Sequence, residues 1–168
     1  MTGTQPSVKH QSLPTELYFS LVRQQLSDSG SAFVRVTGSS MQPLLHHLRD
    51  GVILVPPAKI RAGDIVLFDR RNGRYALHRV VRITGGDTFT MAGDNQAHLE
   101  RSLPLAQVVG VVSAVVRDGK QIPCGRGWVR VYALAMAWFA VPRIIVRRVI
   151  GRLTGPFRNR KGSKGAGQ

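Results

Sequence analysis

The sequence predicts a mainly β fold: a folded-over antiparallel β domain with an N-terminal helix and a C-terminal apolar, basic helix. From residue 32 onward, short apolar runs alternate with Gly, Pro and Asp clusters, which is typical of short strands joined by tight turns. Helical periodicity is confined to the two ends of the chain. Hydrophobic residues make up 43% of the 168 residues, which is enough for a core and argues against a disordered chain.

The N-terminal part divides into two segments. Residues 1–12 are polar, and we expect them to be disordered. Residues 13–30 predict a helical segment because apolar residues recur within it at helical spacing. Pro14 suits the first turn, Thr15 is a candidate N-cap, and Gly30 is a typical C-terminal stop.

The predicted β domain covers residues 31–125. Turn signals within it include Arg71-Asn72-Gly73 and Asp118-Gly119, both suited to hairpins. Seven short strands joined by such turns favour an antiparallel arrangement. The runs that we expect to form strands are Ala32–Val36, Val52–Val55, Ile65–Phe68, Tyr75–Ile83, Thr88–Met91, Val108–Val116 and Gln121–Pro123.

The C-terminal segment, residues 126–157, predicts an apolar helix that Pro142 interrupts. Its uncharged stretch, 131–142, is too short to cross a bilayer of about 30 Å. Aromatic residues and flanking arginines favour a position in a membrane interface. The alternative is a helix packed on the β domain. Residues 158–168 are rich in Gly, Lys and Arg and predict a flexible basic tail.

Positive charge is concentrated at the C-terminal end. The chain has a formal net charge of +15, and all nine acidic residues precede position 119. Residues 126–168 contain ten Lys and Arg and no acidic residue. This end of the chain is therefore the part that would bind an anionic partner. The single cysteine, Cys124, excludes an internal disulfide.

Four short blocks carry the chemistry, in the order Val36–Pro43, Gly63–Val66, Leu77–Val81 and Gly93–Asn95. The first block presents Ser40 after a strand and before Met and a turn-forming Pro. A serine becomes a nucleophile only when a base removes its proton, and the base must lie within about 2.6–3.2 Å. Together the blocks resemble the signal peptidase I clan, which includes the self-cleaving domain of LexA-type repressors. The resemblance covers about half the chain, from Val34 to Arg117.

The resemblance implies a role for each site residue. Ser40 is the nucleophile, and His78 stands where bacterial relatives have a lysine base. The signal peptidases of the endoplasmic reticulum and of many archaea have histidine there, and an imidazole titrates near neutral pH. Asp94 matches the acid that orients this histidine, although it could instead cap a turn. Glu100 is a possible second acid, and its alternative is a solvated loop carboxylate.

The oxyanion of the reaction needs hydrogen-bond donors, and the backbone N–H groups of Ser40 and Ser39 are the candidates. Gly38 stands where many bacterial relatives add a serine hydroxyl. In the relatives the segment that corresponds to residues 50–52 usually reads Asp-Gly-Asp, and in this chain Val52 replaces the second acid. We expect no cofactor and no metal, because the histidines lack the spacing of a metal site.

The sequence therefore predicts a serine endopeptidase of the signal peptidase type, which cleaves leader or signal-like peptides through an acyl-enzyme. The substrate would bind as an extended strand. A second expected partner is an anionic membrane surface, which the C-terminal segment would contact. We therefore expect the protein to be membrane-associated. If the C-terminal segment is only a packed helix, we expect the protein to be cytoplasmic. The alternatives are a self-cleaving LexA-like regulatory domain and a basic module with a decayed site that binds membranes or nucleic acid. Nucleic acid is the less favoured ligand, because no aromatic-basic RNA signature is present.

Overall fold

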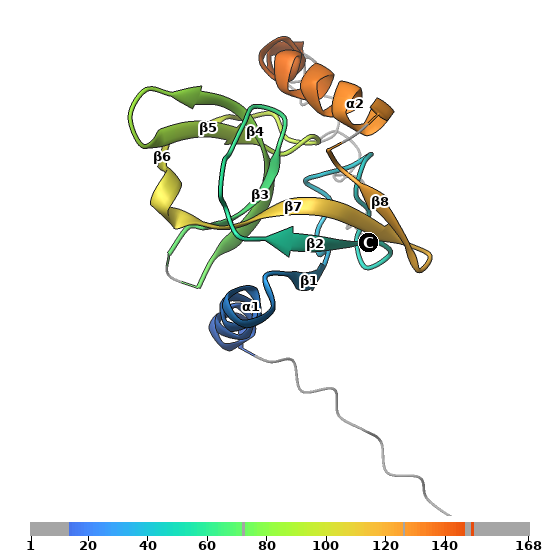
Figure 1. The fold of residues 1–168 in the computed structure, drawn as a ribbon. Coiled ribbons are helices and arrows are strands. Elements are labelled where there is room, and N and C mark those ends of the chain that lie inside the picture. Colours follow the sequence, from blue (N-terminus) through green and yellow to red (C-terminus); the bar gives the residue numbers. More distant parts are fainter. Residues whose placement is uncertain (1–13, 72, 126, 147–148, 150–168) are drawn as a thin grey trace, which may run out of the picture.

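The computed structural model describes residues 14–71, 73–125, 127–146 and 149. The expected disordered N-terminus (1–12) and basic tail (158–168) lie outside these residues. The elements in chain order (Figure 1) are α1 (Thr15–Ser29), β1 (Ala32–Arg35), β2 (Gly51–Val55), β3 (Ile65–Asp69), β4 (Tyr75–Thr84), β5 (Thr88–Ala92), β6 (Glu100–Pro104), the 3-10 turn η1 (Leu105–Gln107), β7 (Val108–Arg117), β8 (Lys120–Pro123) and α2 (Gly127–Trp138).

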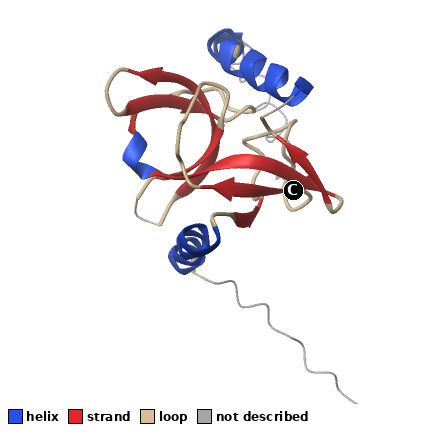
Figure 2. Ribbon diagram, viewed as in Figure 1, coloured by secondary structure: helices blue, strands red, loops and turns tan. Residues whose placement is uncertain are grey.

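The strands, red in Figure 2, form one antiparallel sheet in the order β1-β2-β7-β3-β4-β5-β6, and β8 pairs with β7. Register shifts in four of the strand pairs bend the sheet, so that it folds over on itself. One core cluster lies under α1, and a second is enclosed by β3, β4, β5 and β7. The predicted folded-over antiparallel β domain is confirmed.

One strand, β6, is absent from the sequence-based prediction. Its five residues, Glu100–Pro104, include two charges and end in proline, and they form the edge of the sheet beside β5. An edge strand packs little apolar surface and commonly carries charged residues or proline, so it lacks the apolar run that identifies a central strand. The described residues therefore contain eight strands where seven were predicted. The missing strand begins at Glu100, which matters for the site.

Helix α1 packs across the sheet at the β1 end. Its N-cap is Pro14, not Thr15 as predicted, and Gly30 ends it in the left-handed conformation. Val22 and Leu26 are buried in the core, and the Phe19 ring stacks on Tyr75 with ring centroids 3.8 Å apart.

The C-terminal segment forms two helical pieces, α2 and Ala140–Val146, which we call the C-terminal helix pair. They are bent by 57° at the break. Pro142 explains the position of the break, since it lacks an N–H and its ring collides with the carbonyl four residues earlier, at Trp138. No single helix among the described residues is long and apolar enough to cross a membrane, although the bent pair together meets that criterion of length and composition.

Candidate active site

Ser40 lies in the turn that follows β1 and is partly buried. The turn is closed by hydrogen bonds from the N–H of Gln42 to the carbonyl of Ser39 and from the N–H of Leu45 to the carbonyl of Met41. Met41 and Leu45 are buried in the core cluster under α1. The residue after the serine therefore serves as an apolar anchor that fixes the turn on the domain.

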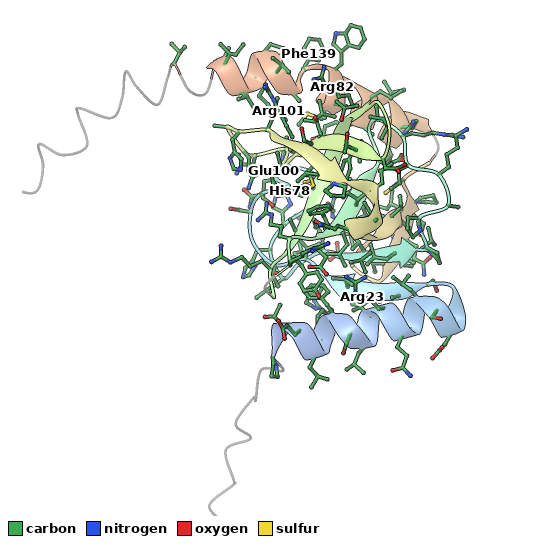
Figure 3. The ribbon with its side chains drawn as sticks, turned by 90° about the vertical axis from the view of Figure 1, so that its left-hand side faces the viewer. Arg23, His78, Arg82, Glu100, Arg101 and Phe139 are labelled. Carbon is green, nitrogen blue, oxygen red and sulfur yellow. The ribbon has the colours of Figure 1, made fainter. Side chains whose placement is uncertain are left out.

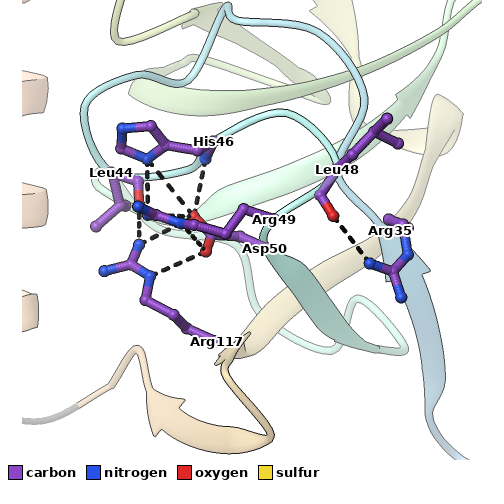
Figure 4. A network of polar contacts seen from close by, with 7 residues as sticks. All are labelled: Arg35, Leu44, His46, Leu48, Arg49, Asp50 and Arg117. Carbon is purple, nitrogen blue, oxygen red and sulfur yellow. Dashed lines mark hydrogen bonds and ion pairs between the residues drawn. The ribbon is translucent and has the colours of Figure 1, made fainter.

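Asp50 holds the other end of this loop (Figure 4). Its fully buried carboxylate accepts hydrogen bonds from Arg117, Arg49 and the backbone N–H of His46, at distances of 2.8–3.0 Å. Arg117 also donates to the carbonyl of Leu44. Burial alone would raise the pKa of Asp50, but the hydrogen bonds from Arg117 and Arg49 outweigh it and hold the pKa well below its usual range. Asp50 is thus the hub of the loop that carries Ser40.

The next positions account for one departure from the relatives' pattern and for two histidines. Val52 is fully buried in the core on β2, so an apolar residue suits this position. His47 accepts a hydrogen bond from the N–H of Gly38 at 2.9 Å, and His46 contacts Arg49. Both histidines therefore stabilise the nucleophile loop. In the part of the chain that the structure describes, no three His, Cys, Asp or Glu residues are grouped as metal ligands.

The turn Gly93–Asn95 holds Ser40 from the opposite side. The N–H of Asn95 donates to the carbonyl of Ser40 at 2.7 Å, and the Asn95 side chain donates to the carbonyl of Ser39. A Cβ at Gly93 would lie 2.6 Å from the Ser40 carbonyl oxygen, closer than real side chains approach. Only glycine therefore allows this turn to contact the serine backbone.

His78 lies in β4 opposite Val66 of β3, and only 3% of it is exposed. Its Nδ1 lies 2.7 Å from Oε1 of Glu100 on β6, and Figure 3 shows the two side chains together. Arg70 donates two further hydrogen bonds to the same carboxylate. The Glu100 side chain is only 16% exposed. It is therefore not a solvated loop carboxylate, which was the alternative interpretation of this residue from the sequence.

The charge of Glu100 fixes the tautomer of His78. Burial would raise the pKa of Glu100, but the hydrogen bonds from His78 and Arg70 outweigh it and lower the pKa to about 2. The ionised carboxylate only accepts hydrogen bonds, so Nδ1 of His78 must carry a proton. In the neutral imidazole, Nε2 then has the free lone pair. This is the tautomer that a general base needs.

Asp94 was expected to orient His78, and the structure places it elsewhere. Its carboxylate accepts two hydrogen bonds from Arg79, at 2.6 and 2.8 Å, and both side chains are buried. His78 and Arg79 are consecutive on β4, and consecutive strand residues face opposite sides of a sheet. Asp94 therefore meets the neighbour of the histidine, and Glu100 occupies the position that was assigned to Asp94.

The Arg79–Asp94 pair also connects the two halves of the site. Arg79 pairs with Ala92 at the end of β5, and the turn that follows Ala92 binds the backbone of Ser40 through Asn95. The topology thus brings the Ser40 turn to the end of β5, beside the part of β4 that contains His78, although the two residues are 38 positions apart.

The Gly63-Asp64 turn is part of the framework around this pair. Nη1 of Arg79 donates to the carbonyl of Gly63, and Asp64 forms an ion pair with Arg130 of α2 at 3.0 Å. The Arg79 guanidinium also lies over the ring of Tyr132, 5.7 Å from its centroid. These contacts seat α2 against β4, behind the site.

A cavity of about 380 Å³ lies between α1 and the sheet. It begins at the end of β1, directly before the Ser40 turn, and includes Leu77, which faces the opposite side of β4 from His78. Its lining residues are Thr15, Tyr18, Phe19, Val34, Arg35, Val36, Thr37, Leu67 and Leu77.

A partly buried serine turn joined to a strand with a buried, carboxylate-bound histidine defines the class of this domain as serine peptidase-like. The family model described as Peptidase S24-like matches residues 2–116, about two thirds of the chain. The chain belongs to this family of LexA- and signal peptidase I-type serine peptidases, which confirms the resemblance seen in the sequence. Comparison with curated proteins finds no match.

Proposed function

We propose that this protein is a serine endopeptidase of the signal peptidase type, with Ser40 as nucleophile, His78 as general base and Glu100 as the residue that orients the base. The observation that carries the proposal is the buried contact of 2.7 Å between Nδ1 of His78 and Oε1 of Glu100. With a proton on Nδ1, Nε2 is left to accept the hydroxyl proton of Ser40, whose backbone is bound by the turn that follows β5.

The mechanism follows from these groups. Nε2 of His78 takes the hydroxyl proton of Ser40 as Oγ attacks the substrate carbonyl. Glu100 stabilises the imidazolium that forms, and the N–H groups of Ser40 and Ser39 donate to the oxyanion. His78 then gives its proton to the leaving amine, so the peptide bond breaks and an acyl-enzyme remains. A water molecule, deprotonated by His78, hydrolyses this ester and restores Ser40.

The open edge of β1 supports binding of the substrate as an extended strand. Both the N–H and the carbonyl of Val36 bond towards the β2 side, to the backbone of Asp50 and Leu48. Because successive residues of a strand direct these groups to alternate edges, those of Arg35 and Thr37 point to the opposite edge. No other strand among the described residues pairs there. A peptide added at this edge would lie along the apolar cavity and reach Ser40.

The proposal is tested with the purified full chain and fluorogenic leader-like peptides that have small residues before the cut. We expect cleavage, and we expect Ser40→Ala and His78→Ala each to abolish it. Ser39→Ala and His98→Ala, at an adjacent serine and at an exposed histidine, are the matched controls and should stay active. Activity that survives in Ser40→Ala would overturn the assignment.

Mass spectrometry of the chain itself distinguishes the LexA-like alternative. The proposal requires that added peptides are cut while the chain stays intact. If the chain is cut and no added peptide is, the protein is a self-cleaving regulator, and the endopeptidase proposal fails.

A further inference from the structure

The C-terminal helix pair presents a large apolar surface to solvent. Trp138 is 83% exposed, Val131 69% and Phe139 59%, values unusual for side chains of this size. Eight of the thirteen exposed large hydrophobic side chains in the described part of the chain lie between residues 131 and 149, in the helix pair or next to it. They are Val131, Leu134, Trp138, Phe139, Val141, Ile145, Val146 and Val149.

The opposite face of the helix pair is packed on the β domain. The buried residues recur at helical spacing and are Val129, Ala133, Ala137, Ala140 and Ile144. The ion pair between Arg130 and Asp64 and the stacking of Arg79 on Tyr132 add polar contacts to this packing. Figure 1 shows α2 lying on the outside of the sheet, so the exposed face, which is opposite the buried residues, is directed away from the sheet.

Two exposed arginines lie beside the exposed face. Arg82 and Arg101 are exposed and lie on the side of the domain that carries Phe139 (Figure 3). Arg101 lines a groove together with Val141 and Ile145 of the second helical piece. Beyond position 125 the chain has ten basic residues and no acidic one. The surface thus combines apolar area with positive charge, as required at the interface of an anionic membrane.

We propose that the exposed face of the C-terminal helix pair docks onto the surface of an anionic lipid bilayer. The helices lie in the interface and do not cross the bilayer, because their other face stays packed on the β domain. Apolar side chains enter the acyl boundary, and the arginines contact the headgroups. This inference is independent of the proposed peptidase activity.

Flotation of the full chain with vesicles tests the proposal. We expect it to bind vesicles of phosphatidylcholine with phosphatidylglycerol and to bind pure phosphatidylcholine more weakly. High salt should reduce the binding without abolishing it, because salt screens only the electrostatic part. Trp138→Ser with Phe139→Ser should lower vesicle affinity at least about tenfold, since these side chains carry much of the exposed apolar area.

The matched control is Leu17→Ser with Leu21→Ser, which removes two exposed apolar side chains from α1, at the other end of the molecule. This variant should bind vesicles like the parent. Three outcomes would overturn the proposal: a full chain that does not float at low salt, equal losses in the two double variants, or a homodimer in solution that only Trp138→Ser with Phe139→Ser dissociates. None of these readouts uses peptide cleavage, so failure of the peptidase proposal would leave them interpretable.

Discussion

Two carboxylates flank β4, and they contact neighbouring residues on its opposite faces. Glu100 binds the imidazole of His78, while Asp94 binds the guanidinium of Arg79. The first contact sets a tautomer, which is a chemical task. The second neutralises a buried charge and fixes the turn that holds Ser40, which is a structural task. The two acids should therefore respond differently to the same conservative change.

We predict that Glu100→Gln lowers kcat by a factor of about 10²–10⁴, because the amide no longer selects the base tautomer or stabilises the imidazolium. Asp94→Asn should instead lower the free energy of unfolding by about 3–5 kcal/mol, because it leaves Arg79 buried without a counter-charge. Peptide turnover and urea unfolding of both variants test this. The division of roles is wrong if Asp94→Asn loses turnover while keeping its unfolding free energy.

A second residue-scale prediction concerns Gly93. A methyl group there would press on the Ser40 carbonyl oxygen, so Gly93→Ala should displace the nucleophile turn and lower kcat by about tenfold or more. Gly85→Ala is the matched control, because nothing lies within 4 Å of a Cβ at that turn position. Equal turnover in the two variants would contradict the proposed support of Ser40 by the 93–95 turn.

At the scale of elements, the central strands and the helix break could be predicted from the sequence because burial leaves a periodic pattern. Pro142 signals the break through the chemistry of one residue. Strand β6 could not be predicted, since it packs little apolar surface and its pairing with β5 is specified by contacts distant in sequence. For the same reason the sequence indicated Asp94 as the partner of His78 and Glu100 only as a possible second acid, as only the position of β6 shows that Glu100 reaches His78.

Helix α1 supports a prediction about specificity. Tyr18 lines the cavity beside the β1 edge, so Tyr18→Ala should enlarge the space that receives a substrate side chain. We expect a shift of preference towards larger residues before the cut, visible mainly in KM. Arg23→Ala, on the same helix but outside the cavity lining, should keep the parent preference. A peptide library that gives identical profiles for Tyr18→Ala and the parent would place the substrate elsewhere.

On the scale of the whole molecule, ion pairs connect elements that are distant in sequence. Within the described ranges, arginines pair with five acidic residues, which are Asp50, Asp64, Asp69, Asp94 and Glu100. Several of the pairs join segments that build the site, including the loop after Ser40, strand β6 and helix α2. Loss of these ion pairs would therefore weaken the site and the fold together.

The acid sensitivity of the fold follows from the depressed pKa values of Asp50 and Glu100, the latter lowered to about 2. Both carboxyls have lower pKa values in the folded chain than their ordinary 3.8 and 4.5, so they stabilise the fold above those ordinary values. This stabilisation is lost as the pH falls from about 4.5 towards 2. We predict that the parent loses unfolding free energy across this window.

Glu100→Gln should flatten that decline, since glutamine takes up no proton, while Gly85→Ala should keep the parent slope. Urea unfolding at several pH values across the window measures both slopes. A parent and a Glu100→Gln variant with the same slope would mean that the Glu100 carboxyl titrates alike in the folded and unfolded chains. The conclusion that Glu100 is ionised and fixes the tautomer of His78 would then be wrong.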